Sequence, residues 1–208
     1  MNPVLERTKI QPAIEQRVAN GEPQPVRWTR NEYYRMAELG FFDGKRVELI
    51  GGEIIEMSPM KTAPATAVRL VIEVLRGVFA KGFIVDSQLP MNFGKTDEPE
   101  PDVAIVEGKT RDFAESHPKI AALIIEISDT TLNYERNRKA SLYAKNKIQD
   151  YWIVNLKDRH LEIYRRPMKD KNAFYNFSYG EIQILTEKDS VAPLIKPDAE
   201  IKVADLLP

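Results

Sequence analysis

Apolar and polar residues alternate along the chain with two different periods, and each period predicts one kind of element. Between about residues 64 and 80, apolar side chains recur every three or four positions, which predicts an amphipathic helix. A second helix is expected at Arg30–Leu39, because Thr29–Glu32 has the form of a capping box and Gly40 stands where a helix-ending glycine belongs. A third helix is expected at about Tyr134–Asn146.

Short β-rich runs lie between these helices. Arg46–Ile50 and Glu53–Met57 flank a Gly51-Gly52 pair, which predicts a tight hairpin. Ala121–Ile127 is almost continuously apolar, as is typical of a strand buried on both faces. Further strands are expected at Phe83–Leu89, Asp102–Val106, Tyr151–Val154 and Leu161–Tyr164, with small peripheral strands after Tyr175. The order of these elements predicts a mixed α/β (α+β) fold, in which helices flank a mixed central sheet.

The length of the chain indicates its domain organisation, and its composition excludes membrane segments and sites that need cysteine. The chain has 208 residues, which we interpret as an N-terminal extension over residues 1–27 followed by one domain over residues 28–208. No apolar run approaches the ~20 residues that span a bilayer, so no membrane segment is expected. The absence of cysteine excludes disulfides, zinc–thiolate sites and cysteine nucleophiles. We expect a cytoplasmic protein.

The charge of the chain weighs slightly against a nucleic-acid partner. The formal net charge is −1 and the calculated pI is about 6.2, whereas domains that bind nucleic acids commonly have a pI above ~9. Basic residues still gather locally, at Arg136–Lys139 and at Arg165-Arg166. An acidic metal site would also lower the net charge of the metal-free protein, so the overall charge leaves both interpretations open.

Two carboxylates stand out by their positions in the expected sheet. Glu126 interrupts the apolar run Leu123–Ile127, where an ionised group is costly unless a cation, a metal or hydrogen-bond donors compensate its charge. Asp102 follows Pro101 and is the first residue of the expected strand Asp102–Val106, which precedes the strand that contains Glu126. A carboxylate at the start of one strand and another at the end of the next could hold a hard cation. The alternatives are a turn at Asp102 and a Glu126 that forms a salt bridge with an arginine.

Two other side chains are weaker candidates for chemistry. Glu48 alternates with Val47 and Leu49, so the pattern alone favours a solvated surface position over a metal ligand. Lys139 lies on the expected helix after Glu126 and shares a face with Tyr143, four residues further on. It could position a water molecule or stabilise a developing negative charge, but the default for this basic helix is a solvated face.

Several segments, in this order, resemble a bacterial family known as putative restriction endonucleases, a former domain of unknown function within the PD-(D/E)XK nuclease superfamily. The matching segments are Tyr33–Ala37, Arg46–Ile50, Gly52–Ile54, Met57–Pro59, Ser87–Pro90, Glu98–Asp102, His117-Pro118, Ile125–Ser128, Lys139, Leu142–Ala144 and Asp150–Trp152. They extend from about Trp28 to Pro167 and are far more specific together than any one of them alone.

The resemblance implies a restriction-endonuclease-like core and a catalytic set. Asp102 and Glu126 would be the two ligands of Mg²⁺, with Mn²⁺ as an alternative, and Glu48 would be an upstream acid. Nucleases of this superfamily usually carry lysine two residues after the second acid, a position that Ser128 occupies here. This family moves the lysine to the next helix, which makes Lys139 the candidate. Gln88, Ser128 and Tyr143 are candidates for substrate-binding or pocket residues.

The same resemblance implies hydrolysis of DNA by a homodimer, because cutting two strands favours two active sites. The sequence departs from the family pattern in two places. Lys61–Ala65 lacks the histidine that often follows the Ser-Pro segment, and Tyr134-Glu135 replaces the usual Tyr-Asp before the lysine. A catalytically degenerate module that keeps the nuclease fold and binds nucleic acid or protein therefore remains the alternative, as does a hydrolase acting on another phosphorylated substrate.

Overall fold

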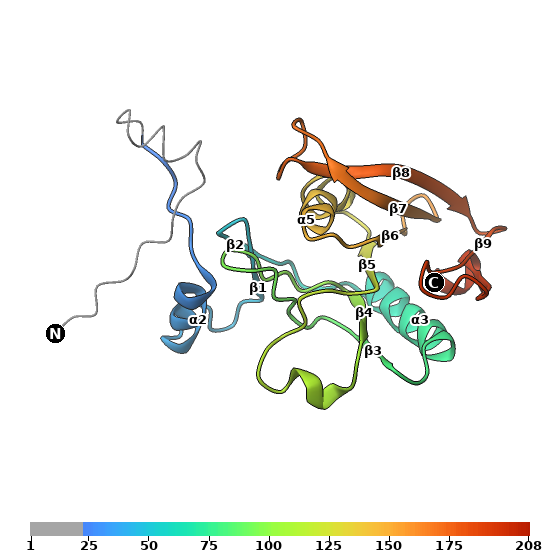
Figure 1. Cartoon of the computed structure of the whole chain (residues 1–208), viewed down its shortest axis with the longest axis horizontal. Coiled ribbons are helices and arrows are strands. Elements are labelled where there is room, and N and C mark those ends of the chain that lie inside the picture. Colours follow the sequence, from blue (N-terminus) through green and yellow to red (C-terminus); the bar gives the residue numbers. More distant parts are fainter. Residues whose placement is uncertain (1–22) are drawn as a thin grey trace. The chain divides into compact units, whose positions relative to one another are not determined.

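The computed structural model describes residues 23–208 (Figure 1), so most of the expected extension at residues 1–27 lies outside the described residues. The chain forms two compact units. The first ends at Met57 and takes in Gly94–Glu98, and the second comprises Ser58–Phe93 and Pro99–Pro208. Within the described part of the chain, no helix combines the length and the apolar character needed to cross a membrane.

The described part of the first unit contains one helix and one hairpin. Helix α2 (Arg30–Glu38) begins with the expected capping box, in which Thr29 and Glu32 bond each other's backbone N–H groups. The hairpin joins β1 (Val47–Ile50) to β2 (Glu53–Glu56). Both residues of its turn, Gly51 and Gly52, have a positive φ, which glycine adopts without strain. The sequence prediction of a capped helix followed by a Gly-Gly hairpin is therefore confirmed.

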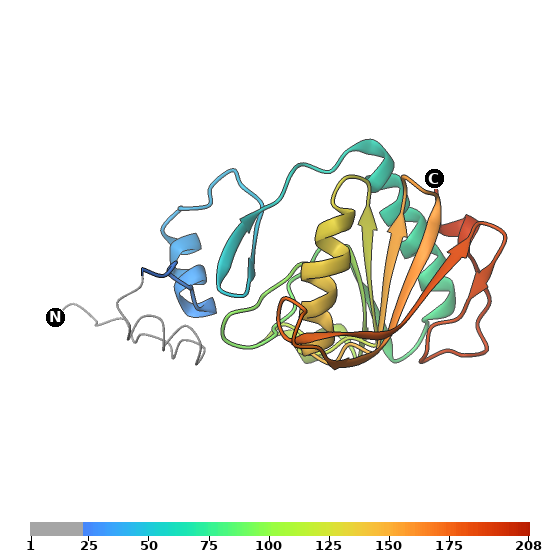
Figure 2. The ribbon, with the colours of Figure 1, turned by 90° about the horizontal axis from the view of Figure 1, so that it is seen from above.

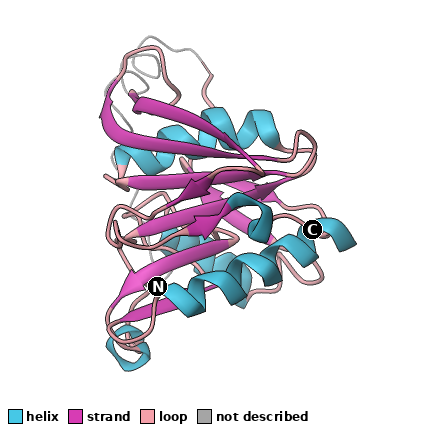
Figure 3. Ribbon diagram, turned by 90° about the vertical axis from the view of Figure 1, so that its right-hand side faces the viewer, coloured by secondary structure: helices cyan, strands magenta, loops and turns pink. Residues whose placement is uncertain are grey.

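The second unit is built on a six-stranded sheet in the order β3-β4-β5-β6-β7-β8, seen between helices in Figure 3. Only β5 and β6 are parallel, and the other neighbouring pairs are antiparallel. The strands are β3 (Phe83–Asp86), β4 (Val103–Glu107), β5 (Leu123–Ser128), β6 (Asp150–Asn155), β7 (His160–Lys169) and β8 (Phe177–Thr186). Smaller elements are η1 (Thr110–Phe113), β9 (Ser190–Val191), β10 (Ile201–Lys202) and η3 (Val203–Leu206).

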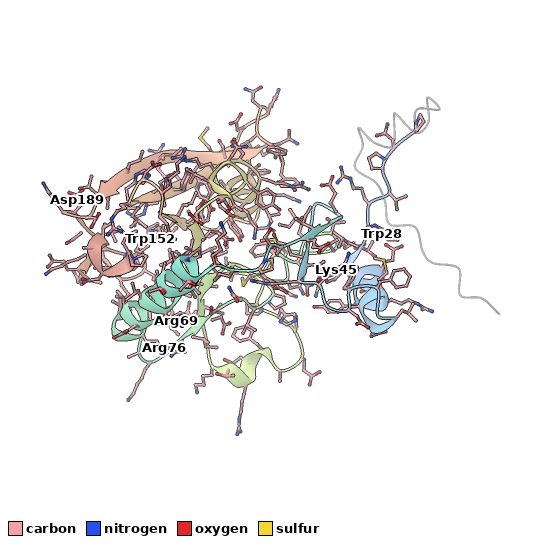
Figure 4. The ribbon with its side chains drawn as sticks, turned by 180° about the vertical axis from the view of Figure 1, so that it is seen from behind. Trp28, Lys45, Arg69, Arg76, Trp152 and Asp189 are labelled. Carbon is pink, nitrogen blue, oxygen red and sulfur yellow. The ribbon has the colours of Figure 1, made fainter. Side chains whose placement is uncertain are left out.

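Helices cover both faces of this sheet (Figure 2). On one face, α3 (Thr62–Val78) buries Val71 and Leu75 against a core that includes Ile125 and Trp152. Figure 4 shows Trp152 in this core, whereas Arg69 lies on the exposed side of α3. On the other face lies the connection between β5 and β6, which parallel strands require. It consists of α4 (Leu132–Tyr134), a π-helical turn η2 (Glu135–Lys139) and α5 (Ala140–Lys145).

The mixed sheet with flanking helices confirms the expected fold, but two expectations about its parts are wrong. The prediction of small peripheral strands after Tyr175 is confirmed for β9 and β10 but is wrong for β8, which is a ten-residue strand of the central sheet, paired along β7. The single helix expected at about Tyr134–Asn146 is interrupted by the π-helical turn η2. A π turn contains one more residue than an α turn and changes which side chains face the sheet.

Candidate active site

The sheet brings the two candidate metal ligands together. Asp102 directly precedes β4, and Glu126 lies near the end of β5. The two strands are antiparallel with Val103 opposite Ile125, so the start of β4 lies beside the end of β5. Continuing this register by one residue places Asp102 opposite Glu126, and residues paired across a sheet share a face. Their neighbours Val103 and Ile125 belong to the core beneath α3, so Asp102 and Glu126 lie on the opposite face of the sheet. The juxtaposition expected from the sequence is therefore present.

Each of these carboxylates accepts a hydrogen bond from the backbone of the other strand. Glu126 Oε2 accepts the N–H of Asp102 at 3.2 Å, and Asp102 Oδ2 accepts the N–H of Ile127 at 2.9 Å. Hydrogen bonds from amides to carboxylates are charge-assisted and stronger than bonds between neutral groups. These two reciprocal hydrogen bonds therefore fix one oxygen of each side chain and hold both carboxylates together, where β4 begins and β5 ends.

Glu126 is almost completely buried and is surrounded by donors from the helical connection. Lys139 Nζ lies 3.2 Å from Glu126 Oε1, and the Tyr143 hydroxyl donates to the same oxygen at 2.5 Å. The side chain of Lys139 is 1% exposed, so the expectation of a solvated basic face is wrong at this position. Asp102, Glu126 and Lys139 together carry two negative charges and one positive charge, which favours the binding of a further cation.

The helical connection that contains the π-helical turn η2 carries three buried polar side chains at intervals of four residues. Glu135 and Lys139, four residues apart, are both buried at the two ends of this turn. Tyr143 follows after another four residues on α5 and is also fully buried. Residues four apart on a helix share a face, so Lys139 and Tyr143 both reach the same Glu126 oxygen. π-Helical turns occur frequently at functional sites.

A second buried cluster, centred on Glu162 of β7, holds the same turn against the sheet. Arg136 forms two hydrogen bonds with the Glu162 carboxylate, from Nε at 2.9 Å and from Nη2 at 2.7 Å. The carboxylate also contacts Asn155, His160 and Tyr164, at 2.8–3.1 Å. Glu162 lies opposite Ile153, which in turn lies opposite Glu126, so the two glutamates share a face of the sheet. The Arg136–Glu162 pair therefore anchors the helical segment that carries Lys139.

These contacts change the ionisation of the cluster. Burial raises the pKa of Glu162, but hydrogen bonds from Arg136, His160, Tyr164 and Asn155 together outweigh this effect and lower the pKa to about 2. Burial, together with the hydrogen bond to Glu162, raises the pKa of Tyr164. Glu162 is thus a carboxylate throughout the physiological range, and its negative charge retains Arg136 on the sheet.

The candidate pocket residues Gln88 and Ser128 lie close to the two acids. Gln88 has a positive φ of 54°, and its amide Nε2 lies 3.4 Å from Asp102 Oδ1. Ser128 is 1% exposed, and its hydroxyl oxygen has no hydrogen-bond partner among the described residues. It shares the sheet face of Glu126, two residues away, and lies opposite Asn155 of β6. A buried hydroxyl of this kind can bind a substrate oxygen or a water molecule.

Glu48 lies in the first unit, whereas the other candidate residues lie in the second. The alternation pattern predicted a solvated Glu48, and this is wrong, because the side chain is 1% exposed. All four residues of β1 are buried, so the strand has no solvent face. Glu98 of the segment Gly94–Glu98 pairs with Leu49 of this strand through two backbone hydrogen bonds. The role of Glu48 as an upstream acid stays a prediction.

The donor set of Asp102 and Glu126 suits a hard, partly hydrated cation. Mg²⁺ keeps several waters and is commonly bound through one or two carboxylates. A carboxylate has about four lone-pair positions, so a bond to a backbone amide does not prevent metal binding. Within residues 23–208, no group of three or more His, Asp or Glu side chains has a metal-binding arrangement. The residues therefore fit Mg²⁺ or Mn²⁺ with water ligands better than a cation held only by side chains.

The sequence did not reveal the Glu162 cluster. Arg136 was one of several neighbouring basic residues, and Glu162 follows the alternation of an ordinary half-exposed strand. One usable signal was present, because Arg136 and Lys139 are three residues apart and can share a helix face. The partner of Arg136 was not predictable, since Glu162 lies 26 residues further along the chain.

Comparisons with known proteins agree with this architecture. The chain matches the family model Uma2, described as "Putative restriction endonuclease", over residues 30–204. Among solved structures it is similar to a putative nuclease belonging to DUF820 from Anabaena variabilis ATCC 29413. That similarity has a TM-score of 0.65 at 17% sequence identity and covers 88% of this chain and 97% of the other. No curated protein matches the chain.

The structural similarity confirms the restriction-endonuclease-like fold that the resemblance implied. The family model covers most of the chain, including Asp102, Glu126 and Lys139. This protein belongs to the Uma2 family, described as "Putative restriction endonuclease", and its fold is consistent with the PD-(D/E)XK superfamily.

Proposed function

We propose that this protein is an Mg²⁺-dependent endonuclease that hydrolyses phosphodiester bonds in DNA. The observation that carries the proposal is the pairing of Asp102 with Glu126, together with the buried Lys139 at 3.2 Å from Glu126 Oε1. Burying a lysine beside two carboxylates is costly, and the binding of a metal cation by the two acids would compensate part of this cost. Family membership supports a nuclease as the class of enzyme.

The two acids and the lysine would have different tasks. Asp102 and Glu126 would hold the metal, which when bound supplies a Lewis acid for a phosphoryl oxygen and lowers the pKa of a water molecule. Tyr143 and Lys139 donate to one Glu126 oxygen, so they restrict how this carboxylate can rotate. Lys139 would also stabilise the negative charge that develops on the phosphoryl group during attack by water.

Substrate contacts would come from the polar side chains around the acids. Ser128 offers a buried hydroxyl without a partner among the described residues, which suits a phosphate oxygen or the attacking water. Gln88 offers an amide close to Asp102 Oδ1 and would bind a substrate atom or orient Asp102. Both assignments predict reduced affinity for substrate, rather than loss of the fold, when the side chain is shortened.

The principal alternative is a module that keeps the fold, binds nucleic acid or protein, and does not cleave. One observation favours the protein-binding form of this module, namely that several cations of the two basic clusters are already paired with carboxylates. Arg136 is paired with Glu162, Lys139 with Glu126, and Arg165 with Asp150. These pairs reduce the positive charge that the two clusters offer to the phosphate backbone, whose neutralisation provides most non-specific affinity.

Metal binding by Asp102→Asn separates the two possibilities. We expect calorimetric titration with Mg²⁺ or Mn²⁺ to show binding to the wild type and at least a tenfold weaker binding to this variant. Asp198→Asn is the matched control, because Asp198 is exposed and lies far along the chain from β4. Asp102→Asn retains a side-chain oxygen that can accept the Ile127 N–H, so circular dichroism should show that this variant is folded. Equal metal binding by all three proteins would contradict the proposal.

A further inference from the structure

The strand β8 forms an open edge of the six-stranded sheet. It pairs with β7, and no other strand among residues 23–208 pairs with it. Its central residues, 180–184, are all exposed. An edge strand presents a row of backbone N–H and C=O groups on its outer side, and these groups can pair with another strand. Figure 1 shows β7 and β8 as a long hairpin at one side of the second unit.

The composition of β8 does not protect this edge. Proteins usually block edge pairing with lysine, proline or bulges. The segment Phe177–Thr186 contains neither lysine nor proline, and Glu181 is its single charged residue. Ile182 is 59% exposed and Ile184 is 57% exposed, so two large apolar side chains adjoin the open edge. Both lie on one face of the sheet, since they pair with Tyr164 and Glu162 of β7.

The sequence of β8 is complementary to itself in the antiparallel direction. A two-fold axis through Gln183 places Ile182 of one copy opposite Ile184 of the other, and the same pair repeats across the axis. Four isoleucines then form one cluster on one face. Glu181 lies opposite Leu185 in this register, so no two like charges face each other. An axis through Glu181 would instead place two glutamates opposite each other, which is unfavourable.

We propose that two copies of this chain associate through β8, with antiparallel pairing centred on Gln183. The two six-stranded sheets would then form one continuous sheet across the interface. Such an interface is isologous, as expected for the two-fold symmetry of most homodimers. The inference rests on β8 alone and does not depend on nuclease activity.

A single introduced cysteine tests the register directly, because the chain contains none. In the proposed dimer, the two Gln183 residues are direct partners, with Cα atoms about 4.5–5.5 Å apart. A disulfide spans Cα–Cα distances of about 4.4–6.8 Å, so Gln183→Cys should form a covalent dimer under mild oxidation. Glu181→Cys is the matched control on the same exposed strand. Its two copies would lie four strand positions apart, about 13 Å, which is too far for a disulfide.

The contacts of the isoleucines provide a second test that uses no cysteine. Sedimentation velocity should show a dimer for the wild type and a monomer for Ile182→Lys/Ile184→Lys. Ile120→Lys is the control, because Ile120 is 61% exposed but lies in the loop before β5. Circular dichroism should show that all variants are folded. A wild type that stays monomeric over the whole concentration series, or equal cross-linking of Gln183→Cys and Glu181→Cys, would overturn the proposal.

Discussion

Replacing Glu162 by glutamine tests how the helical segment that carries Lys139 is held on the sheet. The Glu162 side chain is 2% exposed, and Arg136 donates two hydrogen bonds to its carboxylate. Glutamine has nearly the same shape but no charge, so it keeps the packing and loses the charge-assisted bonds. We expect Glu162→Gln to be folded but less stable than the wild type, with the difference depending on pH.

The expected loss in free energy of unfolding follows from the ionisation of Glu162. Its pKa is lowered from an ordinary value of 4.5 to about 2, because four hydrogen bonds outweigh burial. At about 1.4 kcal/mol per pKa unit, the ionised carboxylate stabilises the fold by about 3 kcal/mol at pH 7. Because the folded pKa is the lower one, this contribution is complete above the unfolded pKa and is lost as pH falls toward the folded pKa. At about pH 3.5, about 1.4 kcal/mol of it has gone.

Urea unfolding at pH 7 and at about pH 3.5 measures the stabilisation by the Glu162 carboxylate and the part of it that is lost in acid. The wild type should exceed Glu162→Gln by about 3 kcal/mol at pH 7, and by roughly half of that at the lower pH. Glu187→Gln is the matched control, since Glu187 also forms two hydrogen bonds with an arginine, Arg159, but on the exposed surface. Exposed pairs contribute little to stability. Equal losses of stability in the two variants, or a loss in Glu162→Gln that does not change with pH, would show that the Glu162 charge does not stabilise the fold in this way.

Three other substitutions test the roles of Lys139, Tyr143 and Leu75. Lys139→Met should lower DNA cleavage by at least about 100-fold while calorimetry still detects metal binding, because this side chain would act on the developing charge. Tyr143→Phe removes the donor at 2.5 Å from Glu126 Oε1 and should lower the free energy of unfolding by about 1.5–3 kcal/mol, measured with urea. Leu75→Ala, in α3, creates a cavity at a fully buried position and should cost about 2–5 kcal/mol in the same measurement.

The elements of the fold that have local signals were predictable from the sequence. The capping box of Thr29 and Glu32 fixes the start of α2, and two glycines with positive φ fix the turn of the hairpin. The apolar run at β5 predicted a strand buried on both faces, and all six of its residues are buried. Each of these signals depends on residues close in the chain, so no knowledge of distant contacts was needed.

Features that depend on distant contacts were not predictable. Glu48 looked solvated because nothing near it in the sequence indicates that the segment Gly94–Glu98 pairs with β1. The length of β8 was missed because its two exposed isoleucines and Glu181 give no clear pattern of one buried face. The turn η2 was missed because apolar spacing does not distinguish a π turn from an α turn over one turn.

The candidate site was predictable in part, for a physical reason. A buried carboxylate in an apolar strand requires compensation, and this requirement identified Glu126 before its partners were known. The resemblance added Lys139, which the structure places at Glu126. The Arg136–Glu162 ion pair was not predictable, because an arginine on a helix and a glutamate on a strand are each common. Sequence thus identified the unusual charge, and the structure was needed to identify what holds its partners in place.

Cleavage of DNA by the wild type and by Glu126→Ala is the most direct test of a metal-dependent nuclease site formed by Asp102 and Glu126. Both proteins would be incubated with supercoiled plasmid and with single-stranded DNA, in Mg²⁺, Mn²⁺ or EDTA. Glu107→Ala, an exposed acid at the end of β4, is the control. We expect the wild type and the control to cleave only when metal is present, and Glu126→Ala not to cleave under any condition. A folded wild type that cleaves under none of these conditions, or a Glu126→Ala variant that cleaves as well as the wild type, would contradict this site assignment.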